Sequence, residues 1–234
     1  SLPLVHAVVT YFFLTDARRR RASLAYLRPV HAHPLGREVL TRRPGLGEGF
    51  RHYRSFGLAI VDRLAIWFGR DGGFAFTTHG LEQVDRLAEQ GRGALLLGSH
   101  LGSFDALRLL AKRAGSVVNV LMFTANAARI NQVLRELAPE MEAHVIQVDP
   151  GSVTSVFTIR ERLWGGEHVA ILADRIEAGE RDRALAIPLL GSPVRLPQAP
   201  VLLAGLLGCP LVSVVALREG AGRYEVFVDV LAER

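Results

Sequence analysis

The distribution of apolar residues changes near residue 72. Before this point they recur at the spacing of an α-helix, most clearly over residues 50–68. The clearest stripe consists of Phe56, Ile60, Leu64 and Trp67. After a turn at residues 70–73, short apolar runs alternate with amphipathic stretches, and this pattern predicts strands that alternate with helices.

The second pattern predicts an α/β fold. We expect strands over residues 94–98, 117–123, 145–148, 168–173, 184–189, 211–217 and 224–230, and helices over residues 103–114, 126–137, 153–164 and 197–207. Apolar strands separated by amphipathic helices are typical of a mixed, mainly parallel sheet flanked by helices. We therefore expect an N-terminal helical segment over residues 1–72 and an α/β core over residues 73–234, in one continuous domain.

Composition excludes several classes of protein. A chain of 234 residues with 49% hydrophobic residues is too apolar to be disordered, and its single cysteine, Cys209, excludes a disulfide scaffold. The scattered histidines offer too few ligands for a zinc site, and there is no Walker loop or dinucleotide-binding glycine motif. We therefore expect neither a metal nor a cofactor.

The net charge of +5 comes almost wholly from arginine, since Lys112 is the only lysine. One explanation for the predominance of arginine is a compositional bias of the source genome. The other is a partner with phosphate, carboxylate or anionic lipid groups, which arginine binds well. The arginines lack a nucleic-acid recognition motif and interleaved aromatic residues, so we expect no nucleic-acid partner.

The N-terminus is a candidate for contact with a membrane surface. The segment from Leu2 to Leu14 is almost wholly apolar, and four arginines follow it at residues 18–21. The segment is too short to span a bilayer but can lie on one, where the arginines would attract anionic head groups. A buried helix followed by a solvated basic face is the alternative. The longer apolar run from Ala199 to Leu217 is broken by Gly208-Cys209-Pro210, so we do not expect it to span either.

One pair of residues beside the predicted strands has catalytic chemistry. In open α/β sheets, ligands bind beyond the carboxyl ends of the strands. His100 follows the strand over residues 94–98, and Asp105 lies in the first turn of the next helix, where a carboxylate stays ionised. The turn around Gly102 can bring Asp105 to His100 Nδ1, which would leave Nε2 as a general base for an external hydroxyl. A purely structural histidine beside an aspartate is the alternative.

These residues resemble a known family. The His-x4-Asp spacing of His100 and Asp105, after a strand ending in Leu-Gly-Ser, is similar to the catalytic motif of the lysophospholipid acyltransferase superfamily. Within it the chain is most similar to the lipid A late acyltransferases, and the supporting stretches are residues 126–139, 168–175, 187–193 and 200–210. That branch commonly has Glu at the position of Asp105 and Gln at that of Arg175. The Phe-Pro-Glu-Gly stretch of glycerolipid acyltransferases is absent, which argues against glycerol-3-phosphate and lysophosphatidate acceptors.

The resemblance implies that a fatty acyl group moves from an acyl-CoA or acyl-carrier-protein thioester to a hydroxyl of a membrane lipid or glycolipid. It implies His100 as the general base and Asp105 as its partner. The residues that would bind substrate or donor, or stabilise the oxyanion, are Ser103, Asn126, Arg129, Asp174, Arg175 and Arg195. A surface ion pair is the alternative role of Arg175, and a helix cap is that of Asn126.

The resemblance also implies a location and leaves two other functions open. We expect the protein on the cytoplasmic face of the bacterial inner membrane, either peripheral or anchored by a segment upstream of Ser1. A thioester or lipid hydrolase that uses the same histidine on water is one alternative function. A non-catalytic lipid-binding protein on the same fold is the other.

Overall fold

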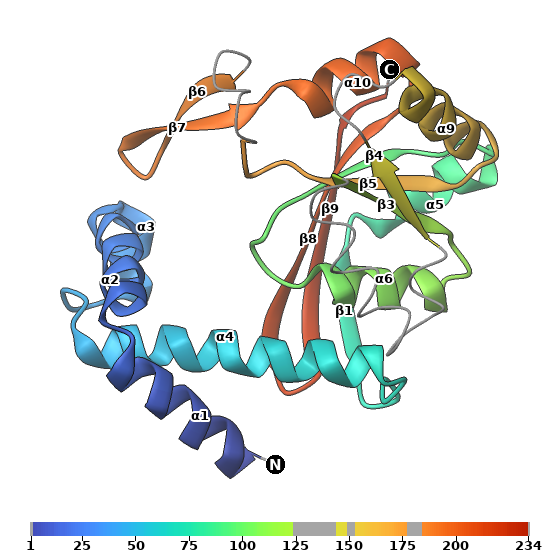
Figure 1. Cartoon of the computed structure of the whole chain (residues 1–234). Helices are drawn as coiled ribbons and strands as arrows, with labels where there is room; N and C mark the ends of the chain where they lie inside the picture. The colour runs from blue at the N-terminus through green and yellow to red at the C-terminus, as the bar shows by residue number, and fades with distance from the viewer. Residues whose placement is uncertain (1, 124–143, 149–152, 177–183, 234) are drawn as a thin grey trace. The chain divides into compact units, whose positions relative to one another are not determined.

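A computed structural model describes residues 2–123, 144–148, 153–176 and 184–233 (Figure 1). The predicted helix over residues 126–137 lies outside these ranges. Contacts within the chain define two compact units, Ser1–Asp62 with Ala186–Arg195 and Arg63–Leu185 with Leu196–Arg234.

The N-terminal residues are helical, as predicted. The helices are α1 (Leu2–Thr15), α2 (Ala17–Ala32), α3 (Pro34–Val39) and α4 (Leu46–Trp67). Phe13 of α1 makes edge-on ring contacts with Phe50 and Tyr53 of α4, at 5.4 and 5.2 Å between ring centroids. A Cβ on Gly57 would lie 2.5 Å from the side chain of Val9, so the absence of a side chain there lets α1 approach α4 closely.

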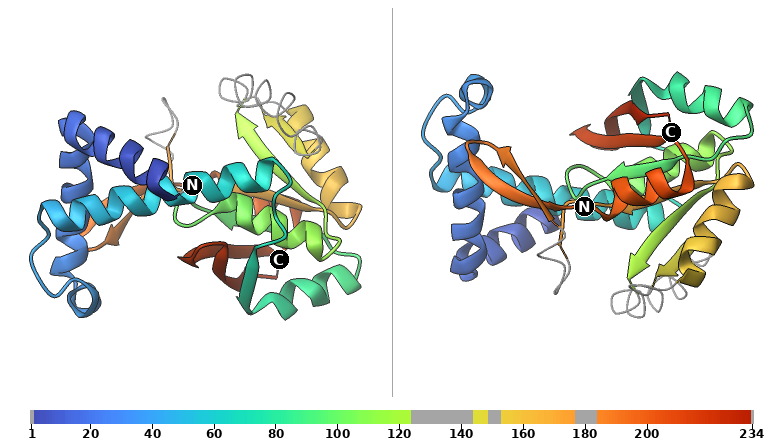
Figure 2. Two further views of the ribbon diagram at one scale, coloured as in Figure 1. Left: turned by 90° about the horizontal axis from the view of Figure 1, so that it is seen from below. Right: turned by 90° about the horizontal axis from the view of Figure 1, so that it is seen from above.

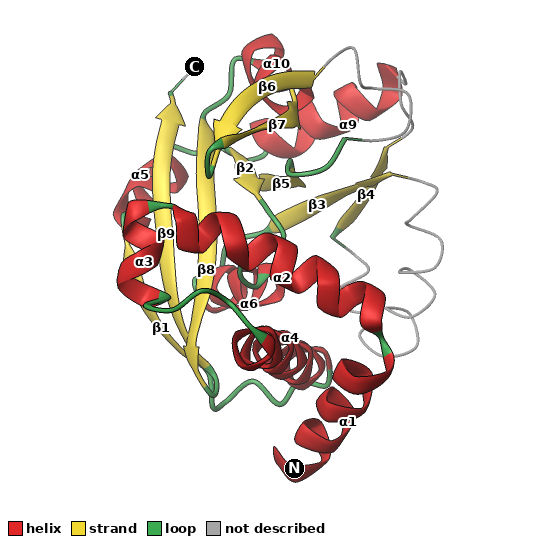
Figure 3. Cartoon of the chain, turned by 90° about the vertical axis from the view of Figure 1, so that its left-hand side faces the viewer, coloured by secondary structure: helices red, strands yellow, loops and turns green. Residues whose placement is uncertain are grey.

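The second unit is built on a mixed, mainly parallel sheet, which confirms the predicted α/β class. Its strands are β1 (Ala75–His79), β2 (Leu95–Gly98), β3 (Val118–Phe123), β4 (Val145–Val148), β5 (His168–Leu172), β8 (Leu211–Gly220) and β9 (Arg223–Ala232). Their order is β1-β9-β8-β2-β5-β3-β4, and β8 with β9 is the antiparallel pair among these described strands. Figure 3 shows β8 and β9 as the long strands of the sheet.

Successive residues of β2 point to opposite faces of the sheet and enter two separate cores. Leu96 packs in the core that contains residues of α5 (Leu81–Glu89) and α6 (Phe104–Arg113). Leu95 packs in the core formed with α9 (Val153–Trp164) and α10 (Ala199–Leu207), which lie next to each other (Figure 2). Helices therefore cover both faces, as the apolar strands predicted.

Some elements differ from the prediction. Strand β1 and helix α5 were not predicted, because β1 is an edge strand with mostly exposed residues and lacks a continuous apolar run. The strand over residues 184–189 exists as β6 (Ala184–Leu189), but it pairs with β7 (Ser192–Pro197) in a separate two-stranded sheet. None of the helices in the described part of the chain is long and apolar enough to cross a bilayer.

The core between α9 and the sheet predicts a large effect of one truncation. Ile159 is 2% exposed in this core, and we expect Ile159→Ala to lower the free energy of unfolding by about 3 kcal/mol, because it leaves a cavity. On the same helix Phe157 is 60% exposed, and Phe157→Ala should change it by less than about 0.5 kcal/mol. Urea denaturation of both variants measures the difference, and similar losses would contradict this packing.

Candidate functional site

The pairing of two neighbouring parallel strands brings the candidate residues together. Strand β2 pairs with β5, and Gly98 at the end of β2 lies opposite Leu172 at the end of β5. His100 and Asp174 each lie two residues beyond these strand ends. The carboxyl ends of parallel strands form one edge of the sheet, so both residues lie where ligands bind in such folds.

Asp174 holds His100 through two hydrogen bonds. The backbone N–H of His100 donates to Asp174 Oδ2 at 2.8 Å, and the ring Nδ1 lies 2.8 Å from Oδ1. Partial burial raises the pKa of the Asp174 carboxyl, but the hydrogen bonds from His100 oppose this, and the net pKa lies below the usual value of an aspartate. The carboxylate is then ionised at neutral pH and can only accept, which places a proton on Nδ1 and the lone pair on Nε2.

The loop that carries His100 is fixed to the neighbouring strand β8. Gly102 has a φ of +81°, and a Cβ there would lie 2.1 Å from the carbonyl oxygen of Ala216. Ser103 donates its backbone N–H to the same carbonyl oxygen at 2.9 Å, and its hydroxyl caps α6 by accepting from Ala106 N–H at 3.2 Å. Ser103 is therefore a buried cap whose own N–H is already bonded, so that N–H is not free for an oxyanion.

Asp105 does not contact the ring nitrogen predicted for it. The carboxylate is 7% exposed and accepts hydrogen bonds from Arg63 Nε at 2.7 Å and from Trp67 Nε1 at 2.8 Å. The expected contact with His100 Nδ1 was wrong, because that nitrogen is bonded to Asp174. Asp105 instead joins the first turn of α6 to the last turns of α4.

Arg63 and Trp67 were not identified as site residues from the sequence. Trp67 was assigned to an apolar helical stripe, and Arg63 had no assignment. Their spacing of four residues puts both on one face of α4, and the Arg63 guanidinium lies 6.0 Å from the centre of the Trp67 indole. An arginine and a tryptophan at this spacing offer N–H donors to one anion. This spacing is the feature of the sequence that could have predicted them as partners of a carboxylate.

The other predicted residues have different positions. Arg175 is exposed beside Asp174, and the described residues give it no hydrogen bond or ion pair. Arg195 is exposed in β7 and belongs to the other compact unit. Asn126 and Arg129 lie outside the described residues. Where the structure describes the chain, no three His, Cys, Asp or Glu side chains gather as ligands for a metal ion.

The arrangement supports proton transfer at the sheet edge. The His100 side chain is 45% exposed, and the described residues place no hydrogen-bond partner on Nε2. An ionised aspartate on Nδ1 fixes the tautomer and stabilises the imidazolium that forms when Nε2 takes a proton. His100 and Asp174 therefore have the geometry of a general base and its orienting group.

Comparison with known proteins identifies a family for the chain. The model of a family described as bacterial lipid A biosynthesis acyltransferase matches residues 50–231, which is more than half of the chain and includes His100, Asp105 and Asp174. No curated protein matches the sequence.

The contacts of the two aspartates predict losses of stability that differ in size. Asp105→Ala leaves the Arg63 and Trp67 donors without their acceptor, and we expect the free energy of unfolding to fall by about 1–3 kcal/mol. Asp174→Ala removes a carboxylate that is one-third exposed, and the loss should be less than about 1 kcal/mol. Urea denaturation measures both, and an equal loss in the two variants would contradict the structural role of Asp105.

Proposed function

Because the chain belongs to the bacterial lipid A biosynthesis acyltransferase family, we propose that it moves a fatty acyl group from a thioester to a hydroxyl of a membrane lipid or glycolipid. The family supports lipid acyl transfer. The thioester donor, an acyl-CoA or an acyl carrier protein, and the hydroxyl acceptor are part of our proposal. The observation that carries it is the Asp174–His100 pair, which leaves Nε2 open at the edge of the sheet.

In the proposed mechanism, Nε2 of His100 takes the proton of the acceptor hydroxyl while the hydroxyl oxygen attacks the thioester carbonyl carbon. Asp174 stabilises the imidazolium. The tetrahedral intermediate collapses, the carbon–sulfur bond breaks, and the departing thiolate takes the proton back from Nε2. The products are an ester and a free thiol, and no covalent acyl-enzyme is needed.

The intermediate carries a negative charge on the former carbonyl oxygen, and we assign Arg175 as its cationic partner. Arg175 follows Asp174 at the same sheet edge, is exposed, and makes no ion pair with the described residues. A guanidinium there can stabilise the oxyanion or bind a phosphate of the donor, since both present oxygen acceptors. Its alternative role is a surface ion pair with Asp174 or Glu177; the described residues show no pair with Asp174, and Glu177 lies outside them.

Helix α1 supports a membrane-bound location for the reaction. Phe13 and Val9 face inward, whereas Leu4, Val8, Tyr11, Phe12 and Leu14 are between 46% and 67% exposed. Arg18 and Arg21 follow in the first turns of α2 and are also exposed. Apolar side chains beside cations bind the interface of an anionic bilayer. We propose that the protein binds the cytoplasmic face of the inner membrane through this surface.

Loss of the general base should remove acyl transfer. We expect His100→Ala to lower kcat/KM by at least about a hundredfold, and Asp174→Asn to lower it strongly as well, because the tautomer with an available Nε2 lone pair is lost. Release of the thiol from acyl-CoA and acyl-carrier-protein donors, with membrane lipid extract added or withheld, measures the reaction. Mass spectrometry of the lipid identifies the acceptor.

Each control in this experiment separates one alternative. Ser99→Ala, which removes a hydroxyl bonded to Leu101 N–H, is the matched change beside His100 and should keep most of the activity. Thiol release that needs no acceptor would show that the protein hydrolyses the thioester and does not transfer the acyl group. Equal background rates for wild type and His100→Ala across the donors would make the protein a non-catalytic lipid-binding protein.

Charge reversal in α2 should weaken membrane binding. We expect the double variant Arg18→Glu/Arg21→Glu to bind vesicles containing phosphatidylglycerol at least tenfold more weakly, since each basic residue near an anionic surface contributes about 1 kcal/mol. Arg70→Glu/Arg86→Glu reverses two exposed arginines of the other unit and is the control. Flotation with vesicles measures binding, and unchanged binding of the first variant would favour a solvated basic face.

A further inference from the structure

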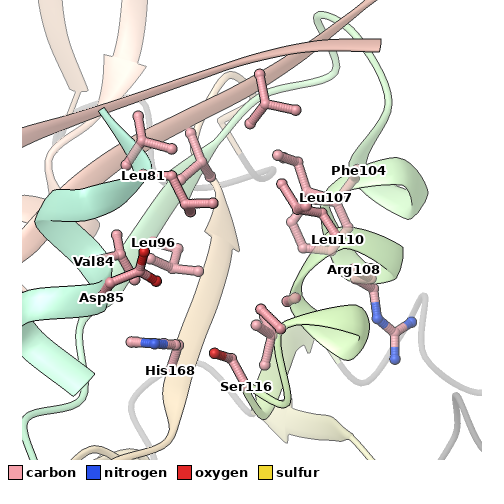
Figure 4. A pocket seen from close by; sticks show the side chains of 16 residues that line it. Leu81, Val84, Asp85, Leu96, Phe104, Leu107, Arg108, Leu110, Ser116 and His168 are labelled. Carbon is pink, nitrogen blue, oxygen red and sulfur yellow. The ribbon is translucent and has the colours of Figure 1, made fainter. Parts of the chain in front are cut away.

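The helices on the two faces of the sheet differ in what they expose. On one face, apolar side chains of α5 and α6 point towards one another across a cavity, as Leu81 and Leu107 show (Figure 4). Neither α5 nor α6, both described in full, exposes a large apolar side chain. On the other face, five described side chains of the neighbouring helices α9 and α10 are between 55% and 74% exposed: Phe157, Trp164, Val201, Leu202 and Leu206. We call these five side chains the α9–α10 surface. Exposed apolar side chains gathered in this way mark a surface that binds a partner or a membrane.

Helix α10 has no polar side chain on any face. Its nine residues, from Ala199 to Leu207, are alanine, proline, valine, leucine and glycine. Ala204 faces inward and packs in the core with α9, whereas Leu202 and Leu206 face outward. A helix at the surface of a soluble domain places polar residues on its outer face, and a helix that is apolar all round is covered on all sides. The outer face of α10 therefore favours an apolar partner.

Helix α9 adds aromatic rings and positive charge beside this apolar face. The Arg160 guanidinium lies 3.7 Å from the centre of the exposed Trp164 indole, in a cation–π contact. With Arg160, Arg162 and Glu161, α9 carries two positive charges and one negative charge, and α10 carries none. Tryptophan prefers the level of the lipid head groups, where a neighbouring arginine meets their phosphates. The α9–α10 surface is therefore complementary to the apolar interior and the anionic head groups of a bilayer.

The first turn of α10 lies at the catalytic edge of the sheet. Strands β5 and β8 both run parallel to β2, and α10 lies between them in the chain. The helix that connects two parallel strands returns from the carboxyl edge of the sheet to the amino edge. Helix α10 ends two residues before Leu211, which pairs with Leu95 at the start of β2. Val201 and Leu202, in the first turn, therefore lie towards the edge that carries His100.

We propose that the α/β unit binds a lipid bilayer through the α9–α10 surface, in addition to the contact proposed for α1. This inference rests on the proposed function, because an acceptor lipid must pass from the bilayer to His100 at the edge where α10 begins. The leucines of α10 insert among the acyl chains of the bilayer. Trp164 and Arg160 lie at the level of the head groups.

The fluorescence of Trp164 reports this contact directly. The other tryptophan is Trp67, whose indole is bonded to the buried Asp105. We expect vesicles of brominated phosphatidylcholine and phosphatidylglycerol to quench the tryptophan fluorescence of wild type, because bromine quenches an indole that lies within the bilayer interface. Trp164→Phe should lose most of this quenching. If wild type binds these vesicles and Trp164 is not quenched, the bilayer contacts another surface and the proposal is overturned.

Charged substitutions in α10 test the surface without its tryptophan. We expect Leu202→Glu/Leu206→Glu to bind vesicles containing phosphatidylglycerol at least about tenfold more weakly, since it loses apolar burial and adds two charges that the anionic surface repels. Phe68→Glu/Val117→Glu changes two other exposed apolar residues of the same unit and is the matched control. Flotation measures binding, and urea denaturation checks that both variants fold. Equal binding of the two variants would overturn the proposal.

Two further measurements separate the proposal from its alternatives. If sedimentation without lipid shows a dimer that Leu202→Glu/Leu206→Glu dissociates, a second copy of the chain covers this surface and the proposal is overturned. Flotation and quenching need no acyl transfer, so the proposed function is tested separately. Quenching of Trp164 in a protein that transfers no acyl group would support the surface and overturn the proposed function. Acyl transfer by a protein whose Trp164 is not quenched would support the function and overturn the surface.

Discussion

The parallel pairing of β2 with β5 determines the geometry of the site. Because Gly98 lies opposite Leu172, the segments beyond both strands leave the sheet together, and Asp174 reaches both the backbone N–H and the ring of His100. A shift of one residue in this register would turn the side chains after β5 to the other face. The catalytic arrangement therefore depends on the same backbone hydrogen bonds that hold the centre of the sheet.

Two aspartates near His100 have separate physical tasks. Asp174 is partly exposed and hydrogen-bonds a group that changes its protonation state during the proposed reaction. Asp105 is buried and accepts from Arg63 and Trp67, so it joins α6 to α4. The acid at the end of the His-x4-Asp motif thus stabilises the helix that follows the catalytic loop.

The sequence by itself determined the class of fold and the location of the candidate site. Apolar runs such as residues 94–98 and 168–173 predicted buried strands, and the rule for strand ends selected His100. The family resemblance added Asp174 and Arg175. Element prediction failed at β1, whose exposed residues lack an apolar run. Strand β6 was predicted with the bounds that it has, but its pairing with β7 in a separate sheet was not.

Only the tertiary structure decided which aspartate contacts His100. Asp105 is five residues away in sequence and Asp174 is seventy-four residues away, so proximity in sequence favoured the wrong partner. The order of strands in a sheet is set by packing between segments that are distant along the chain, and local patterns do not encode it. The same reason explains why Asp105 could be recognised as the acceptor for Arg63 and Trp67 only in the fold.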